Sequence, residues 1–199
     1  MRLIVGLTGG IGSGKSAASA WFEQQGIGVV DADVVAREVV QVGSPVLQQL
    51  VASFGDWVLL ENGELNRRAL REHVFLDDQA RHILNEITHP AIRAAIVEQL
   101  EQASSPYVML VSPLLFESQQ DELTSRSLLI DASIELQIQR ASMRDGQSLE
   151  QIQNIIAAQM SREHKQQRAD DIVLNDGELE HLYAQLRPLH LNYLALSEQ

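Results

Sequence analysis

The chain has 199 residues, and its 45% hydrophobic and 21% charged residues are an ordinary balance for one globular domain or a core with a subdomain. It contains no cysteine, which excludes disulfides, thiolate metal sites and a cysteine nucleophile, and this composition is typical of a reducing compartment. A net charge of −12 argues against a nucleic-acid partner, and the lack of a signal-peptide pattern or of an apolar run of about 18 residues predicts a cytoplasmic protein without membrane contact.

The first predicted elements are a short apolar strand over residues 3–8 and a helix over residues 17–23. Between them lies Gly9-Gly10-Ile11-Gly12-Ser13-Gly14-Lys15-Ser16, which fits the P-loop pattern G-x-x-x-x-G-K-[ST]. Glycines let a phosphate chain approach the backbone, and the start of the following helix attracts negative charge. Lys15 can then reach the β- and γ-phosphates, and the Ser16 hydroxyl can bind Mg²⁺. The alternative is a glycine-rich turn without a ligand.

Four more apolar runs predict strands, at residues 28–31, 107–112, 127–131 and 171–174. Short apolar runs that alternate with helical patterns favour a five-stranded parallel sheet with helices on both faces. The long segment 32–105 keeps a helical period, and we expect a helical insertion that forms one wall of a cleft. Pro90, which follows His89 within this segment, should start or kink a helix.

The second half of the chain carries a possible lid. A helix should follow Ser133, a capping box at residues 148–151 should open a second helix, and the last helix should cover about residues 178–197. Arg140 and Arg144 share a helical face, and Arg162 and Lys165 follow near the end of the second helix. These four cations suit a hairpin that closes over phosphates. The alternative is a solvated face that pairs with the nearby acids Glu135, Glu150 and Glu163.

Carboxylates follow the second strand at the edge where open α/β sheets bind ligands. Asp33 could accept the proton of a substrate hydroxyl, or it could merely cap a helix over residues 34–40. Asp31 could act in the surroundings of Mg²⁺ or could simply end the strand. The sequence leaves both pairs of interpretations open.

The segment after the third strand, residues 112–117, lies at the same edge. Its apolar residues, among them Leu115, could line an acceptor pocket with Glu117 at the rim, or they could pack in the core. Asp131 ends the fourth strand and is a weak candidate for a carboxylate that helps to hold Mg²⁺. His89 could bind substrate, although a histidine before proline is also a common structural residue.

Together, these motifs resemble the dephospho-CoA kinase family over nearly the whole chain. The P-loop alone would indicate only a superfamily, whereas this combination in this order and spacing is specific. The resemblance rests on residues 7–16 and on Asp31-Ala32-Asp33 with Ala36-Arg37, Arg67-Arg68-Ala69-Leu70, His89-Pro90, Pro113-Leu114-Leu115-Phe116-Glu117, Gln159-x-Ser161-Arg162-x-x-Lys165, Ala169-Asp170-Asp171 and Asn175-x-Gly177.

The resemblance implies a P-loop core like that of nucleoside monophosphate kinases, at residues 1–31 and 106–199, with a lid at about 140–165. It implies an insertion at 32–105 that binds the acceptor, and ATP- and Mg²⁺-dependent phosphorylation of the ribose 3′-hydroxyl of dephospho-CoA. Asp33 would be the base, with Lys15 and Arg140 as further catalytic residues. Nucleotide contacts would come from residues 9–16, Ala17, Arg144 and Asn175, and acceptor contacts from Asp31, Asp33, His89, Leu115 and Glu117.

Two positions depart from the family pattern. Ala17 stands where the family usually has threonine, and Val111 stands where many members have aspartate, which leaves the Mg²⁺-linked carboxylate open. Neither change touches Lys15, Ser16 or Asp33, so we expect an active enzyme. The rival interpretations are a nucleoside or nucleotide kinase with another acceptor and a non-catalytic nucleotide-sensing module. The sequence predicts small-molecule partners but no particular oligomeric state.

Overall fold

The computed structural model describes residues 2–146 and 148–198, so that Met1, Gln147 within the predicted lid, and Gln199 lie outside the described residues. The chain divides into two compact units. The first, which we call the sheet unit, combines Met1–Asp31 with Gln102–Gln199. The second, which we call the helical unit, is the continuous segment Ala32–Glu101.

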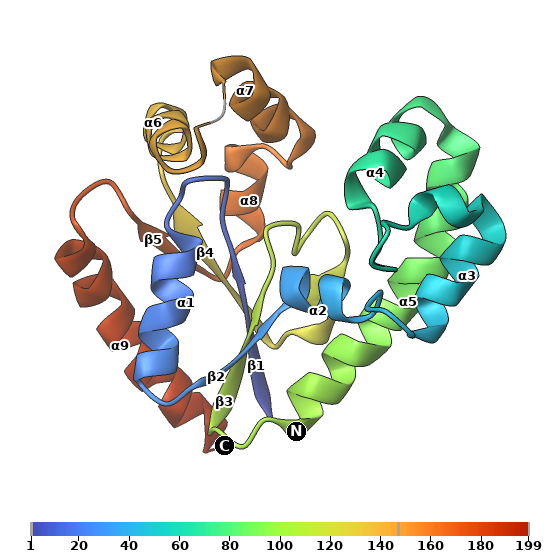
Figure 1. Ribbon diagram of the computed structural model, residues 1–199. Coiled ribbons are helices and arrows are strands. Elements are labelled where there is room, and N and C mark those ends of the chain that lie inside the picture. Colours follow the sequence, from blue (N-terminus) through green and yellow to red (C-terminus); the bar gives the residue numbers. More distant parts are fainter. Residues whose placement is uncertain (1, 147, 199) are drawn as a thin grey trace. The chain divides into compact units, whose positions relative to one another are not determined.

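The sheet unit is built on five parallel strands, as Figure 1 shows. They are β1 (Leu3–Thr8), β2 (Gly28–Asp31), β3 (Tyr107–Val111), β4 (Arg126–Asp131) and β5 (Asp171–Leu174), in the order β2-β3-β1-β4-β5. The central strand β1 pairs with β3 and β4, and its residue Leu7 is in register with both Val111 and Leu128. The predicted parallel sheet is therefore confirmed, with strand ends within one residue of expectation.

One face of the sheet carries α1 (Lys15–Gln24) and α9 (Leu179–Ser197), which contact each other. Leu128 and Ile130 of β4 belong to the core on this face. Residues alternate between the faces of a strand, so Leu129 and Asp131 lie on the opposite face, where α8 (Arg162–Arg168) contacts β4. Gly6 of β1 is also on that face, where Leu115 packs so closely that a Cβ on residue 6 would lie 2.7 Å from its Cδ2.

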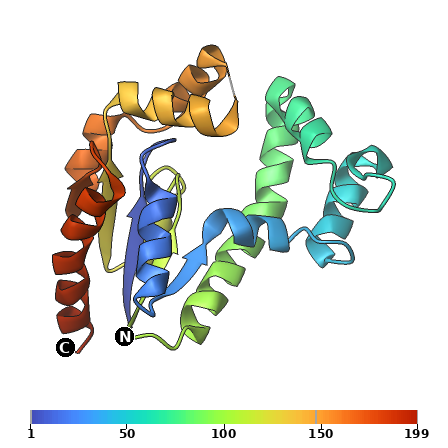
Figure 2. The ribbon, with the colours of Figure 1, turned by 60° about the vertical axis from the view of Figure 1, so that its left-hand side comes forward.

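The segment between β4 and β5 contains α6 (Ile134–Asp145) and α7 (Leu149–Ala158) before α8. Figures 1 and 2 show α6 and α7 at the end of the sheet where β1 turns into α1. Ser133 caps α6, and Ser148 forms the predicted capping box at the start of α7. One expectation was wrong: α7 ends at Ala158, and Arg162 and Lys165 belong to the separate helix α8, because the Ser161 side chain caps a new start.

The helical unit consists of α2 (Ala32–Glu38), α3 (Pro45–Phe54), the short 3₁₀ helix η1 (Asp56–Val58), α4 (Arg67–Leu76) and most of α5 (Asp78–Gln102). Its small core contains Val58, Leu70, Val74 and Ala80. A second 3₁₀ helix, η2 (Gln120–Leu123), belongs to the sheet unit. Among the described residues, no helix combines the length with the hydropathy that a bilayer-spanning segment requires.

Two helix boundaries in the helical unit differ from the prediction. No helix starts at Pro90, since α5 continues through it. Pro90 has no backbone N–H to donate to the carbonyl of Glu86, four residues earlier in the helix. Because Glu86 is exposed, water can replace the missing hydrogen bond. Helix α2 begins at Ala32 and not at residue 34, so Asp33 lies inside its first turn.

Candidate active site

The P-loop joins β1 to α1 and depends on two glycines with left-handed backbone conformations. Gly12 has φ 68° and Gly14 has φ 101°. A Cβ at residue 12 would lie 2.5 Å from the backbone oxygen of Gln137, and one at residue 14 would overlap the side-chain amide of Asn175. Both glycines are thus required by the backbone conformation and by the packing of α6 and of the segment after β5.

Helix α1 starts without the side-chain cap that five other helices receive. Helices α3, α4, α6, α7 and α8 each begin with a serine or asparagine side chain that accepts a backbone N–H. Helix α1 begins after Gly14, and it has neither a side-chain cap nor an acidic residue in its first turn. The positive end of α1 is therefore left to an anion, which is the arrangement that binds phosphate.

Several hydroxyl and amine groups gather around this helix start. Lys15 is the first residue of α1 and is half-buried, and Ser16 after it is exposed. Thr8 and Ser13 are buried, and their hydroxyl oxygens have no hydrogen-bond partner among the described residues. Thr8 belongs to the family motif at residues 7–16, yet no site role was predicted for it, although its position directly before the P-loop could have drawn attention to it.

The donors present fit a magnesium ion that arrives with its nucleotide. No cluster of three or more histidine or acidic side chains suited to a metal occurs in the part of the chain that the structure describes. Mg²⁺ usually keeps several water ligands and binds through substrate phosphates with few protein groups. The exposed hydroxyl of Ser16 at the head of α1 is such a group.

Arg140 and Asn175 are linked to the P-loop by hydrogen bonds. Arg140 Nη1 donates to the backbone oxygen of Asn175 at 2.9 Å, and Nη2 donates to that of Gly177 at 3.3 Å. The buried side chain of Asn175 in turn donates from Nδ2 to the oxygen of Ser13 at 2.7 Å. Beside this chain of bonds lies a hollow of about 480 Å³, lined by Gly14, Arg140, Asn175, Gly177 and residues 178–180.

Gln137 of α6 is a second support of the P-loop that sequence reasoning missed. Its buried side chain donates from Nε2 to the oxygen of Ala132 at 2.9 Å. A Cβ on Gly10 would overlap its Oε1. Because Gln137 and Arg140 are three residues apart on α6, one face of this helix packs against the loop through Gln137 and is linked to it, through Asn175, by Arg140.

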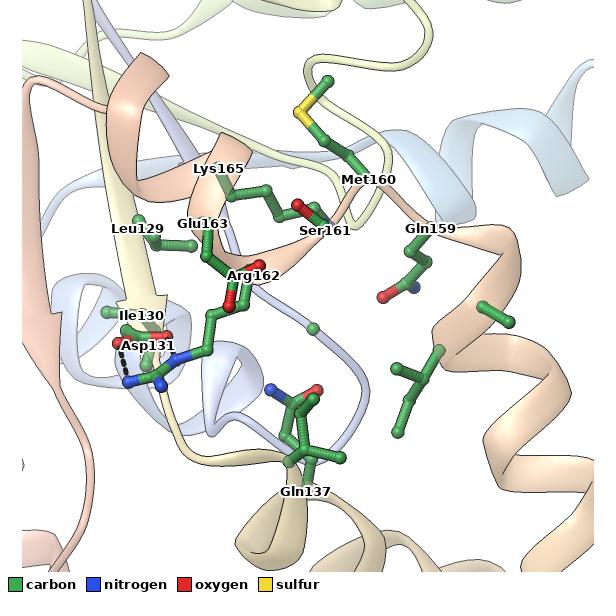
Figure 3. Close-up of a pocket in the computed structure, with 14 residues that line it drawn as sticks. Leu129, Ile130, Asp131, Gln137, Gln159, Met160, Ser161, Arg162, Glu163 and Lys165 are labelled. Atoms are coloured by element: carbon green, nitrogen blue, oxygen red, sulfur yellow. Dashed lines mark hydrogen bonds and ion pairs between the residues drawn. The ribbon is translucent and has the colours of Figure 1, made fainter.

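Asp131, the weak candidate for a Mg²⁺ carboxylate, is occupied by other groups. Arg162 donates to both of its oxygens, at 2.8 and 2.7 Å, and Gln166 Nε2 donates to Oδ2 at 2.8 Å. The hydrogen bond to Asp131 raises the pKa of Arg162. Figure 3 shows this pair on the wall of a pocket of about 270 Å³. Asp131 thus anchors α8 to the end of β4, and Arg162 is neither a solvated cation nor paired with Glu163.

Glu117 and Leu115 lie in a tightly packed part of the sheet unit. Glu117 Oε1 accepts the backbone N–H of Met160 at 2.7 Å and lies 3.3 Å from Lys165 Nζ. Leu115 is fully buried against Gly6, so it would reach a substrate only if this packing opened.

The remaining candidate residues are distributed over both units. Asp31 ends β2 in the sheet unit, and Arg144 is exposed in the last turn of α6. Asp33 is exposed in the first turn of α2, and His89 is exposed on α5, both in the helical unit. Asp33 does not occupy the N-cap position that its structural interpretation required.

The strand order, the P-loop on the central strand and the uncapped helix α1 define a P-loop kinase. A family model described as dephospho-CoA kinase matches residues 3–181. The chain belongs to the dephospho-CoA kinase family.

Individual relatives agree with this assignment. A protein of Acinetobacter baylyi named dephospho-CoA kinase is 71% identical over 191 residues, which cover 96% of this chain and 98% of that protein. A crystal structure from Thermus thermophilus, 33% identical, has a TM-score of 0.83 and covers 96% of this chain and 97% of its own. The dephospho-CoA kinase from Campylobacter jejuni is 27% identical, with a TM-score of 0.70 and 96% coverage of both chains.

Proposed function

We propose that the protein transfers the γ-phosphoryl group of ATP to the ribose 3′-hydroxyl of dephospho-CoA, which produces coenzyme A. One observation supports ATP as the phosphoryl donor: the positive end of α1 lies open inside a P-loop whose glycines pack closely against Gln137 and Asn175. The 71% identity to a protein named dephospho-CoA kinase supports the choice of acceptor. We place the reaction in the cytoplasm, where ATP is available.

The sheet unit would bind the nucleotide. The triphosphate would lie along residues 9–17, with Lys15 on the β- and γ-phosphates. The nucleoside would occupy the hollow beside Arg140 and Asn175, and Arg144 would contact it or the phosphates from the last turn of α6. Ser16 would hold Mg²⁺, which supplies positive charge to the phosphate oxygens when bound.

The helical unit would bind the acceptor, with contacts from Asp33 and His89, and with Asp31 at the end of β2. Asp33 would take the proton of the 3′-hydroxyl as its oxygen forms a bond to the γ-phosphorus and the bond to the leaving ADP oxygen breaks. Lys15 and Arg140 would stabilise the charge that spreads over the phosphoryl oxygens. Glu117 and Leu115 would shape the acceptor wall through the packing of their segment.

Residues 140–165 would act as a lid that closes over the phosphates. The support for this role is the position of α6 and α7 at the P-loop end of the sheet. The hydrogen bonds of Arg140 to the backbone of Asn175 and Gly177 attach one end of this segment, and α8 attaches the other.

The decisive experiment is a coupled ADP-release assay with dephospho-CoA, adenosine, AMP and no acceptor. We expect ADP only with dephospho-CoA at low concentration, and a product with one added phosphate that phosphorus NMR places on the 3′-oxygen. Preferred turnover of AMP or adenosine would instead indicate a nucleoside or nucleotide kinase. ATP binding without acceptor-dependent ADP release would indicate a sensing module.

A further inference from the structure

The helical unit contains a hollow of about 480 Å³, and none of its lining residues is among the catalytic or binding residues proposed above. Its volume is in the range of small-molecule sites. Two arginines from separate helices meet there, since Arg37 comes from the last turn of α2 and Arg67 is the first residue of α4. The other lining residues are Val40, Gln41, Val42, Glu64 and Leu65.

The two arginines are held together although their charges repel. Arg67 Nη2 donates to the backbone oxygen of Arg37 at 3.3 Å, which orients the guanidinium and leaves its other N–H groups for further bonds. Burial and the charge of Arg37 lower the pKa of Arg67, and Glu64 offsets this only in part. Both arginines are exposed, so their guanidinium groups can reach an anion that enters the hollow.

Neighbouring arginines of the same unit behave differently. Arg68 pairs with Glu72 at 3.0 Å, and Arg81 pairs with Asp78 at 2.7 Å. Within the described residues, neither Arg37 nor Arg67 has a carboxylate oxygen within 4.0 Å. In a chain with a net charge of −12, two such cations in one hollow are an arrangement that favours an anionic ligand.

The geometry of α2 suggests which anion this is. Asp33 and Arg37 are four residues apart on α2 and therefore lie on one face, about 6 Å apart along the axis. In dephospho-CoA the diphosphate is attached to the 5′-carbon of the ribose that carries the 3′-hydroxyl. A base and a diphosphate anchor one helical turn apart would match two groups of that one ribose.

We propose that Arg37 and Arg67 bind the diphosphate of dephospho-CoA, an inference that rests on the proposed function. The apolar side chains of Val40, Val42 and Leu65 then offer a surface for the start of the pantetheine arm on the far side of the diphosphate. The arginines act as binding residues that determine acceptor choice, because adenosine lacks the group that they recognise.

The test compares Arg37→Ala and Arg67→Ala with Arg68→Ala, a matched control whose exposed side chain pairs with Glu72. Calorimetry should show that each of the first two variants weakens dephospho-CoA binding about tenfold to a hundredfold, the usual loss for charge-assisted hydrogen bonds. The dissociation constant of ATP and the melting temperature should stay unchanged in all three. Unchanged dephospho-CoA binding in both Arg37→Ala and Arg67→Ala would overturn the proposal.

A second measurement identifies the recognised group. With the P-loop saturated by a non-hydrolysable ATP analogue, inorganic pyrophosphate should compete with dephospho-CoA in the wild type. It should not compete in the double variant Arg37→Ala/Arg67→Ala, and adenosine should bind both proteins equally. An equal loss of adenosine binding would contradict recognition of the diphosphate.

The two proposals can fail separately. If the wild type releases ADP with dephospho-CoA and the arginine variants behave like Arg68→Ala, the diphosphate site is wrong and the proposed function stands. If the wild type shows no such turnover while pyrophosphate binds in an Arg37- and Arg67-dependent manner, the proposed function is wrong, and so is the assignment of the anion to dephospho-CoA.

Discussion

Lys165 and Glu117 form an ion pair inside the sheet unit, with 3.3 Å between Nζ and Oε1. Lys165 is only 3% exposed and also donates to the backbone oxygen of Pro113 at 3.3 Å. The same Glu117 oxygen accepts the N–H of Met160. The chain has only two lysines. Lys15 lies in the P-loop, and Lys165 joins α8 to the segment that follows β3.

Breaking this pair on one side should destabilise the protein. Lys165→Met leaves Glu117 largely buried without its cation, and we expect a loss of about 3 kcal/mol in the free energy of unfolding. The estimate is at the low end because the Glu117 side chain is 20% exposed. Urea denaturation measures the change. The double variant Lys165→Met/Glu117→Gln should recover much of the loss, and a purely additive double variant would show that the two charges are not coupled.

Lys15→Ala should lower kcat by roughly a hundredfold or more, because the compact positive charge on the β- and γ-phosphates is lost. Lys15→Arg should not restore turnover, since a planar guanidinium replaces a point charge. Steady-state kinetics measure both, with the melting temperature as the control for folding. Near-normal turnover in either variant would remove Lys15 from the catalytic residues.

Asp33→Asn tests the proposed base. We expect kcat to fall by about 10²–10⁴-fold while the dissociation constant of ATP is retained, because asparagine keeps the shape but cannot take the proton. The measurement is acceptor-dependent ADP release together with ATP titration. Asp33 lies in the first turn of α2, where a carboxylate also favours the helix, so Asn should change the melting temperature only slightly. An unaltered kcat would show that Asp33 is not the base.

Arg140→Ala should lower kcat more than it weakens ATP binding. The arginine would meet charge that develops during transfer, and it also holds the backbone of Asn175 and Gly177 beside the P-loop. Hydrogen exchange over residues about 140–165 should slow with ATP plus acceptor more than with either alone. Arg144→Ala is the companion variant. If Arg140→Ala and Arg144→Ala both leave kcat/KM unchanged, these arginines are surface charges and the proposed lid role of residues 140–165 is wrong.

His190 should make stability depend on pH. Its Nδ1 lies 2.7 Å from the Tyr107 hydroxyl, and burial lowers its pKa. The folded state therefore binds the proton less readily than the unfolded chain, whose histidine titrates at about 6.5. The contribution of the neutral ring is complete above that pH and is lost as the pH falls from there through the lower pKa of the folded state.

Urea denaturation at about pH 7.5 and 5.5 measures this effect. The wild type should lose more stability on acidification than His190→Gln, whereas His164→Gln, which changes an exposed histidine, should behave like the wild type. Equal losses in the wild type and in His190→Gln would show that the half-buried ring of His190 does not control the dependence of stability on pH.

The sequence predicted those parts of the fold that depend on local pattern. The strands, the P-loop and the caps at Ser133 and Ser148 are each encoded within a few neighbouring residues, and all were placed within a residue or two. Of the two expectations at Pro90, a helix start or a kink, the start was wrong, because the exposure of Glu86, which makes the proline tolerable, is a tertiary property.

The partners of charged side chains could not be predicted in the same way. Arg162 was expected either to close over phosphates or to face solvent and nearby glutamates. Its partner is instead Asp131, which is 31 residues away and reaches it only through the packing of α8 on β4. Gln137 carries no motif, and its support of Gly10 and Gly12 depends on the position of a whole helix. Roles that require both units, such as those of Asp33 and His89, remain predictions.

The helical unit is inserted between the two segments that form the sheet unit, and this order in the chain determines when each unit can form during synthesis. The helical unit is one continuous stretch, so it can fold soon after residue 101 leaves the ribosome. The sheet unit has to wait for β5 and α9, whose Tyr193 is fully buried against Tyr107 and donates to Asp171 at 2.8 Å. The P-loop emerges among the first residues, yet the core that supports it is completed by nearly the last ones, so a prematurely terminated chain would contain the motif without the site.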